Sequence, residues 1–332
     1  MYIFHISIKI SQYLIEKYKG MRTSGSILPH PLRCGVPPRG RRYIFNPPFL
    51  AGGEGKIYNE GESVANAMYE EMNLPVPDLG GYLARLGLDG AAPAGLDGLN
   101  ELIYRHHTHV PFEDLDVSWL RRPVALDIPS LYRKIVEKRR GGYCYELNAL
   151  FTRLLLDLGY DVRSVFCRIV RGRDFLPPSA HRAAVVALDG GLYFCDVGFG
   201  GPMPAGALWI GDGHAQEIRG EAFRVKRFDE YWWTVARRTS AGDWEDILQF
   251  NTFPQISQEF LAANMRSEKD PSSIFVQMKH VALRTEEGSL SITGDAFTVR
   301  DRDGVRTETI ADDGRLVEIL DRYFGIPAAS LA

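Results

Sequence analysis

One segment limits the possible folds more than any other: a helical run followed directly by strand-like sequence. From Leu147 to Leu158 apolar side chains recur at spacings of three, four, seven, eight and eleven residues, which predicts an amphipathic helix beginning near Cys144. Gly159 stands where a glycine commonly ends a helix. Beyond Gly159 the apolar period shifts to two, which predicts strands. The chain therefore places its helices and strands in separate stretches, as α+β proteins do.

The same two periods divide the rest of the chain. We expect earlier helices around 79–86, 96–103 and 128–138. The expected strands cover 162–170, 183–188, 192–197, 222–227, 231–237, 244–249, 275–283, 289–293 and 297–302, and a closing helix covers 316–324. This order predicts a helical domain at 72–160, a β-rich domain at 161–265 and a small mixed domain at 266–332.

The first 71 residues have a different texture. Residues 20–66 are rich in Gly, Pro and Arg and show neither apolar period. A packed core cannot be built from such material, so we expect poor order. A second explanation is that residues 1–71 are a mis-assigned upstream extension, with translation starting at Met68 or Met72.

Composition narrows the class of partner. The formal net charge is −3 and the isoelectric point about 6.3, so nothing favours nucleic acid or an acidic membrane surface. No apolar run approaches the roughly 18 residues that cross a membrane, and the first 20 residues do not resemble a signal peptide. The four cysteines form no CxxC pair, which favours a reducing, cytoplasmic location.

Cys144 is the candidate nucleophile. It lies in the first turn of its predicted helix, where the partial positive charge of the helix terminus favours a thiolate. Gly141 and Gly142 precede it and leave room for a substrate beside the sulfur. The alternative is that Cys144 is a small buried hydrophobic residue.

A predicted hairpin supplies the partners of the thiol. Asp189-Gly190 is a strong two-residue turn signal, which would pair Leu188 with Gly191. His181 and Asp196 would then be diagonal neighbours on one face, within hydrogen-bonding reach. Cysteine, imidazole and carboxylate together make a nucleophilic triad. The inference depends on the turn type, because a slip of one residue separates the two side chains; Asp196 would then be an unpaired surface aspartate.

Other candidates for chemistry are weaker. His106, His107 and His109 lack a further ligand at metal-site spacing, so we expect a solvated helix end and no metal. Cys167 and Cys195 lie in apolar strands and are expected in the core.

Three motifs resemble those of the arylamine N-acetyltransferases. Residues 140–148, RGGYCYELN, resemble the family signature RGGxCxExN. Residues 110–116, VPFEDLD, are similar to the segment (I/V)PFENLD, and residues 196–200 match D(V/A)GFG. The resemblance covers the chain from about Leu74 to its end and does not include residues 1–70.

The resemblance implies a fold and a reaction. The fold would be an N-terminal helical bundle, a central antiparallel β-barrel and a C-terminal α/β lid, with a core shared with cysteine proteases and transglutaminases. The reaction would be ping-pong transfer of acetyl from acetyl-CoA, a co-substrate rather than a bound cofactor, to an arylamine or arylhydrazine. We expect a monomer or homodimer with no other partner.

The resemblance also implies residue roles. Cys144 would be acetylated, with His181 as its base and Asp196 orienting His181. Phe112, Phe199 and Gly200 would line the acceptor pocket. Glu113 and Arg140 would form a buried ion pair, and Asn148 would give structural support. Asp114 departs from the family pattern, which usually has Asn there.

Two other functions stay open. An amide synthase that acts on a polyketide thioester would use the same triad. A cysteine hydrolase of transglutaminase or protease type would pass the acyl group to water or to a protein amine, although the segments at 110–116 and 196–200 weigh against it.

The extension hypothesis makes a direct prediction. Native expression from the gene should yield a protein that starts at Met68 or Met72, which intact-mass spectrometry would reveal. A mass that corresponds to a start at Met1 would contradict it.

Overall fold

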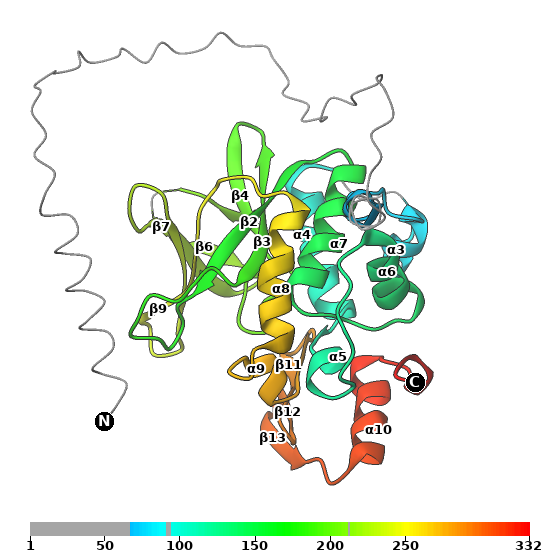
Figure 1. Ribbon diagram of the computed structural model, residues 1–332. Coiled ribbons are helices and arrows are strands. Elements are labelled where there is room, and N and C mark those ends of the chain that lie inside the picture. The colour runs from blue at the N-terminus through cyan, green and yellow to red at the C-terminus, as the bar shows by residue number, and fades with distance from the viewer. Residues whose placement is uncertain (1–66, 91–93, 212) are drawn as a thin grey trace, which may run out of the picture. The chain divides into compact units, whose positions relative to one another are not determined.

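The computed structural model describes residues 67–90, 94–211 and 213–332, which belong to one compact unit (Figure 1). The expectation of poor order for residues 1–66 lies outside these residues. Residues 67–71 are helical, and the Met72 side chain that follows is buried in the core.

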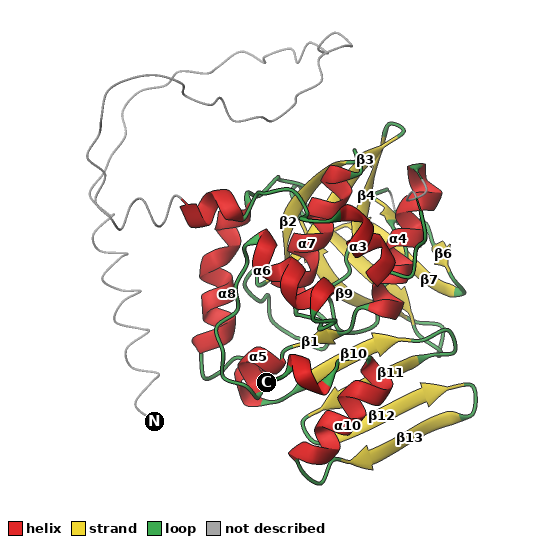
Figure 2. Cartoon of the chain, turned by 90° about the vertical axis from the view of Figure 1, so that its right-hand side faces the viewer, coloured by secondary structure: helices red, strands yellow, loops and turns green. Residues whose placement is uncertain are grey.

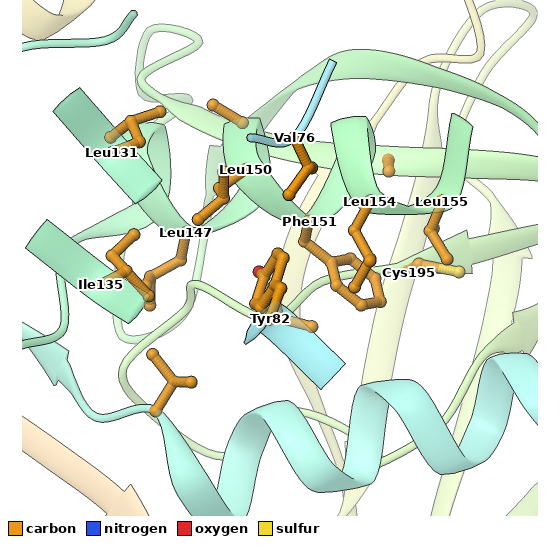
Figure 3. Packing of buried hydrophobic residues seen from close by; sticks show 14 of the residues in the cluster. Val76, Tyr82, Leu131, Ile135, Leu147, Leu150, Phe151, Leu154, Leu155 and Cys195 are labelled. Carbon is orange, nitrogen blue, oxygen red and sulfur yellow. The ribbon is translucent and has the colours of Figure 1, made fainter. Parts of the chain in front are cut away.

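Helix α7 (Cys144–Asp157) is the centre of the helical region. Around it lie α3 (Leu79–Arg85), α4 (Gly95–His109), α5 (Leu115–Ser118), α6 (Ile128–Tyr132) and the π-helix η1 (Arg133–Glu137). The apolar face of α7 packs against α6, η1 and α3, where Leu147, Leu150 and Phe151 lie close to Leu131, Ile135 and Tyr82 (Figure 3). Burial of this face fixes the helix that carries Cys144.

An eight-stranded antiparallel sheet follows α7 and curls into a nearly closed barrel. Its spatial order is β5-β4-β3-β2-β9-β8-β7-β6. The strands are β2 (Asp161–Ile169), β3 (His181–Leu188), β4 (Gly191–Cys195), β5 (Leu208–Trp209), β6 (Gln216–Ile218), β7 (Glu221–Arg227), β8 (Trp233–Arg238) and β9 (Trp244–Phe250). Helix α7, which begins at Cys144, packs on β2 and on β3, the strand that begins at His181.

The C-terminal region holds a second, five-stranded antiparallel sheet in the order β1-β10-β11-β12-β13 (Figure 2). Its first strand, β1 (Phe112–Glu113), comes from the helical region. The other strands are β10 (His280–Arg284), β11 (Ser289–Thr293), β12 (Ala296–Asp301) and β13 (Gly304–Thr309), and α10 (Asp313–Phe324) and η3 (Ala328–Ser330) cover them. The elements η2 (Ser257–Glu259), α8 (Phe260–Lys269) and α9 (Ile274–Gln277) connect the two sheets.

The α+β fold class with helical bundle, antiparallel barrel and C-terminal α/β region is confirmed. The strand expected at 275–283 is wrong in its first half, because residues 274–277 form α9 and the strand begins at His280. The sequence analysis missed α8 and β13: β13 is exposed along its length, so it shows no apolar alternation. The domain boundaries stay predictions.

The predicted hairpin register is confirmed. Leu188 pairs with Gly191, and Ala184 pairs with Cys195. Asp189 and Gly190 have positive φ angles of 49° and 79°, as a type I′ turn requires at both central positions. The turn therefore sets which residues of β3 and β4 share a face.

Gly141, three residues before Cys144, is tightly packed, whereas Gly190 in the turn between β3 and β4 is not. A Cβ at Gly141 would lie 1.9 Å from the backbone oxygen of Pro111, whereas a Cβ at Gly190 would meet nothing within 4 Å. We predict that Gly141→Ala lowers the free energy of unfolding by about 3 kcal/mol or more, through overpacking. Gly190→Ala should cost only about 1 kcal/mol, from backbone strain. If chemical denaturation shows that both variants lose the same free energy of unfolding, the prediction is wrong.

Candidate active site

Cys144 is the first residue of α7, and its side chain is buried. The Glu146 carboxylate accepts a hydrogen bond from the backbone N–H of Tyr143 at 3.0 Å and so caps the helix start. The thiol therefore sits at the N-terminal end of a helix whose start is fixed, where backbone N–H groups point toward it.

His181 and Asp196 reach each other from neighbouring strands. His181 begins β3 and Asp196 directly follows β4. His181 Nε2 lies 2.6 Å from Asp196 Oδ2, and both side chains are buried. This contact occupies Nε2, which leaves Nδ1 for the hydrogen bond between His181 and Cys144.

Asn148 joins the helix to the loop that carries Asp196. Its amide nitrogen donates to Asp196 Oδ1 at 2.9 Å and to the Arg182 carbonyl, and its oxygen accepts from Val197 N–H at 3.1 Å. Gly198 N–H also donates to Asp196 Oδ1, at 2.8 Å. Asn148 follows Cys144 by one helical turn, so these bonds hold the loop against the first turn of α7.

The loop approaches Cys144 so closely that only glycine fits. A Cβ at Gly198 would lie 2.9 Å from the Cys144 Cα and 2.8 Å from Asn148 Nδ2. Cys144, His181 and Asp196, which the sequence analysis selected, are thus assembled at one place.

The charges of the three side chains depend on one another. Burial alone would lower the pKa of His181, but the carboxylate of Asp196 and the charge on Cys144 outweigh it and raise the pKa to about 10. Burial would raise the pKa of Asp196, yet the His181 imidazolium and the hydrogen bonds from Asn148 and Gly198 hold it below its usual value. At neutral pH the geometry favours an imidazolium at His181 that lies between Cys144 and the carboxylate of Asp196.

His107 contacts the loop that carries Asp196, a role that its sequence context did not indicate. Its Nε2 lies 3.0 Å from the backbone oxygen of Asp196, and burial lowers its pKa to about 4, so the neutral ring donates this bond. The expected solvated helix end was wrong: His106 is fully buried against Tyr82 and Phe151, and His107 and His109 are half-buried. The partner of His107 lies 89 residues away in sequence, so no local pattern could have found it.

Arg182 was also missed. Its guanidinium is buried, donates to Ser164 Oγ at 2.8 and 3.2 Å and lies over the Phe260 ring. In the described part of the chain it forms no ion pair with a carboxylate. Burial lowers its pKa to about 9, and the charge on Cys144 opposes this shift. The only sequence signal was an arginine within an otherwise apolar strand.

Phe112, Phe199 and Gly200 lie beside the triad. The Phe199 ring packs edge-on against His181 with a centroid distance of 5.7 Å. A Cβ at Gly200, whose φ is +69°, would lie 2.7 Å from the Phe112 ring. His280 Nε2 contacts the Gly200 carbonyl at 2.9 Å and so holds this turn.

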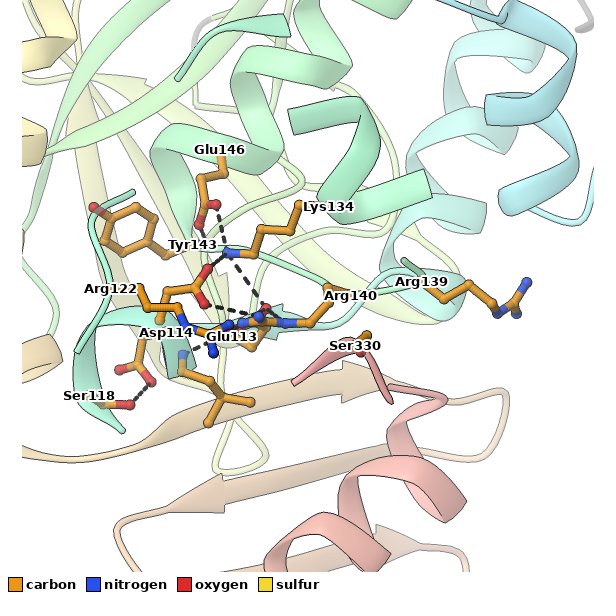
Figure 4. Close-up of polar contacts among 12 residues, drawn as sticks. Glu113, Asp114, Ser118, Arg122, Lys134, Arg139, Arg140, Tyr143, Glu146 and Ser330 are labelled. Atoms are coloured by element: carbon orange, nitrogen blue, oxygen red, sulfur yellow. Dashed lines mark hydrogen bonds and ion pairs between the residues drawn. The ribbon is translucent and has the colours of Figure 1, made fainter. Parts of the chain in front are cut away.

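A buried charge cluster supports the segment ahead of Cys144 (Figure 4). Arg140 contacts Glu113 at 2.9 Å, which is the expected ion pair, and Asp116 at 2.9 Å. Lys134 contacts Asp116 and Glu146 at 2.7 Å each. Asp116 and Lys134 were not foreseen. Because Glu146 also caps α7, the cluster connects β1 to the helix of the nucleophile.

Asp114 is a buried carboxyl without a cationic partner in the described residues. Its Oδ1 accepts hydrogen bonds from Ser118 Oγ at 2.9 Å and His280 N–H at 2.8 Å, while Oδ2 has no partner there. Burial raises the pKa of Asp114 to about 8. A protonated carboxyl resembles the amide of Asn in shape and charge.

No group of three or more His, Cys, Asp or Glu among the described residues is arranged to hold a metal ion. No helix among them has the length and apolarity needed to cross a membrane.

The chain is similar to known proteins in both sequence and structure. A family model described as N-acetyltransferase matches residues 95–330. The arylamine N-acetyltransferase of Mycolicibacterium smegmatis is 35% identical over 264 residues, which are 77% of this chain and 94% of that protein. The structure of Mycobacterium marinum arylamine N-acetyltransferase in complex with CoA superposes with a TM-score of 0.70 at 29% identity, over 77% of this chain and 95% of that one. Proansamycin X synthase of Amycolatopsis mediterranei is 31% identical over 181 residues, 54% of this chain and 69% of its own length.

Asp114 gives a pH-dependent prediction. A carboxyl whose pKa is higher in the folded than in the unfolded chain stabilises the fold fully below about pH 4 and loses this contribution as pH rises toward 8. Asp114→Asn removes the ionisation. The melting temperature of Asp114→Asn minus that of the unmodified chain should therefore be larger at about pH 9 than at about pH 5, by about 5 °C or more. Asp295→Asn, on the surface, is the control; a constant difference for Asp114→Asn would contradict the prediction.

Proposed function

The chain belongs to the arylamine N-acetyltransferase family, and from this premise we propose that it carries acetyl from acetyl-CoA to an arylamine or arylhydrazine through acetyl-Cys144. The observation that carries the proposal is the 2.6 Å contact between His181 and Asp196 beside the first turn of α7. A relative with CoA bound supports the donor. The three described cysteines, Cys144, Cys167 and Cys195, are free, which agrees with a reducing cytoplasm.

The first half-reaction is acylation of the enzyme. The Cys144 thiolate attacks the thioester carbonyl, and the bond from carbonyl carbon to CoA sulfur then breaks. The CoA thiolate takes the proton of His181. One thioester replaces another, so the step needs little driving force. Backbone N–H groups at the start of α7 are suitably placed donors for the oxyanion.

The second half-reaction is release to the amine. Acetylation removes the negative charge from Cys144, which is one of the groups that raise the pKa of His181. The imidazole therefore becomes a better proton acceptor only once the enzyme is acetylated. The amine attacks the thioester carbonyl, His181 takes the amine proton, and the Cys144 thiolate leaves.

The aromatic side chains beside the triad support a flat acceptor. Phe199 packs on His181, and Phe112 closes against Gly200. Such walls favour an arene and keep water from hydrolysing acetyl-Cys144. We assign Asn148 and the Glu113–Arg140 pair to support, because both fix the chain around Cys144. The chain acts as a monomer or homodimer in this proposal.

An amide synthase is the second candidate. It rests on the similarity to proansamycin X synthase, which covers about half of this chain. The acyl group would then come from a polyketide thioester rather than from acetyl-CoA. A failure of acetyl-CoA to acylate Cys144, with acylation by a longer thioester, would favour it.

The two half-reactions predict ping-pong kinetics. Double-reciprocal plots of initial rate at several amine concentrations should be parallel. Asp196→Asn should lower kcat about 10⁴-fold, by analogy with a triad aspartate in serine proteases. Asp321→Asn, on the exposed face of α10, should leave kcat unchanged. Intersecting lines, or equal effects of the two substitutions, would contradict the scheme.

The coupling of His181 to Cys144 predicts a measurable pKa change. The imidazole signals of His181 in NMR should titrate near pH 10 in the unmodified enzyme. In Cys144→Ala, which lacks the thiolate, the midpoint should move to lower pH. The half-buried His280, in contact with Gly200, serves as the control and should not move. An unchanged His181 midpoint would show that Cys144 carries no charge in the resting enzyme.

A further inference from the structure

Strand β13 is an open edge of the C-terminal sheet. It stands last in the strand order β1-β10-β11-β12-β13, and Figure 2 shows it at the outer side of that sheet. Every residue of β13 is exposed, the apolar Val305 included. In the described part of the chain no further strand pairs with it, so one row of its backbone groups has no ladder partner.

The register with β12 shows which backbone groups of β13 face outward. Ile310, directly after β13, donates its N–H to the Asp295 carbonyl at 2.7 Å, and this pair continues the register of the two strands. Antiparallel strands bond through alternate residues, so the even-numbered residues of β13 bond to β12. The N–H and C=O groups of residues 305, 307 and 309 therefore point away from the sheet.

The edge lacks several features by which proteins block pairing at sheet edges. The sequence of β13, GVRTET, contains neither proline nor lysine, and its six residues pair with β12 in one register without a bulge. Valine and threonine, which favour strands, fill the three outward positions. The two charged residues, Arg306 and Glu308, have opposite sign. The edge is therefore open to a strand whose charges match.

The charges fit a second copy of the same strand in one register. When two β13 strands pair antiparallel, outward residues must lie opposite outward residues. A register centred on residue 306 or 308 places Arg306 or Glu308 opposite its own copy, which is repulsive. The register centred on Thr307 pairs all three outward residues and places Arg306 opposite Glu308 of the second copy, on both sides of the centre.

The existing ion pairs on this face fit the same register. Within one chain Arg306 contacts Asp301, and Glu308 contacts Arg315 at 2.6 Å. Contact between Arg306 and Glu308 of the second copy would join these pairs into a network in which the charges alternate. Isolated exposed ion pairs contribute little, whereas a network contributes more.

The other face of β13 also matches. Thr298 Oγ1 and Thr307 Oγ1 lie 3.1 Å apart across β12 and β13. In the register centred on Thr307, this side chain meets its own copy, so the row of threonines continues across both chains. Val305 lies opposite Thr309 of the second copy and loses exposed apolar surface. Threonine pairs and pairs with a β-branched residue stabilise neighbouring strands.

We propose that β13 pairs antiparallel with β13 of a second copy of this chain, centred on Thr307, so that the two C-terminal sheets form one continuous sheet. The three outward residue pairs supply up to about six backbone hydrogen bonds. This surface belongs to the homodimer and contains none of the triad side chains. The proposal therefore does not depend on the acetyl-transfer chemistry.

The first test is sedimentation equilibrium of the full chain. We expect a monomer–dimer equilibrium with a Kd of about 100 μM or tighter. Arg306→Glu places like charges opposite each other twice in the dimer and should raise the Kd about tenfold or more. Arg173→Glu makes the same charge change at an exposed position of the barrel region and should change the Kd less than about twofold.

Cysteine cross-linking tests the register. In Thr307→Cys the two introduced thiols lie directly opposite each other, at a Cα distance of about 5.5 Å that a disulfide can span. In Val305→Cys, on the same face, the thiol lies roughly 13 Å along the strand from its own copy. Mild oxidation should therefore give a covalent dimer of Thr307→Cys, whereas Val305→Cys should give no more than the unmodified chain.

Three results would overturn the proposal. The first is a chain that stays monomeric at about 500 μM. The second is equal cross-linking of Thr307→Cys and Val305→Cys, which would exclude the register. The third is a dimer that responds equally to Arg306→Glu and Arg173→Glu, which would show that the two copies associate through another surface.

Discussion

The structure depends on the buried carboxylate of Asp196. A charged group in this position is costly unless hydrogen bonds and an opposite charge compensate it, and here His181, Asn148 and Gly198 supply both. These partners come from β3, α7 and the loop after β4. Satisfying one carboxylate therefore brings together the elements that carry the triad, and the His107 bond to the Asp196 carbonyl adds α4.

A second buried cluster fixes the approach to Cys144 from the other side. Arg140 and Lys134 share Glu113 and Asp116, and Lys134 also pairs with Glu146, so the segment before the nucleophile is tied to β1. Strand β1 pairs with β10, which anchors the C-terminal sheet to the helical region. Buried ion pairs are weak evidence for net stability. Here the ion pairs hold Arg140 and Glu146, which flank Cys144 in sequence, in fixed positions. Removing one partner would leave an uncompensated buried charge in this segment.

Short-range patterns in the sequence predicted much of this arrangement. The apolar period from Leu147 to Leu158 located α7, and Asp189-Gly190 set the register that brings His181 to Asp196. Other parts depend on contacts between distant segments, which leave no local period. The partners of Asp116, Lys134 and His107 come from other elements, and the strand expected at 275–283 begins with a helical turn because α9 packs against α8 and α5. Assignment of the motif residues to a reaction came from the family resemblance.

In the proposed reaction, Cys144 carries the acetyl group between the two substrates. The direct measurement is the intact mass of the purified chain after incubation with acetyl-CoA in the absence of amine, beside Cys144→Ala. We expect one added acetyl group on the unmodified chain, none on the variant, and loss of the adduct when an arylamine is added. No adduct on a protein whose Cys144 still reacts readily with an alkylating agent would contradict it, because the nucleophile would then be active toward a different acyl donor.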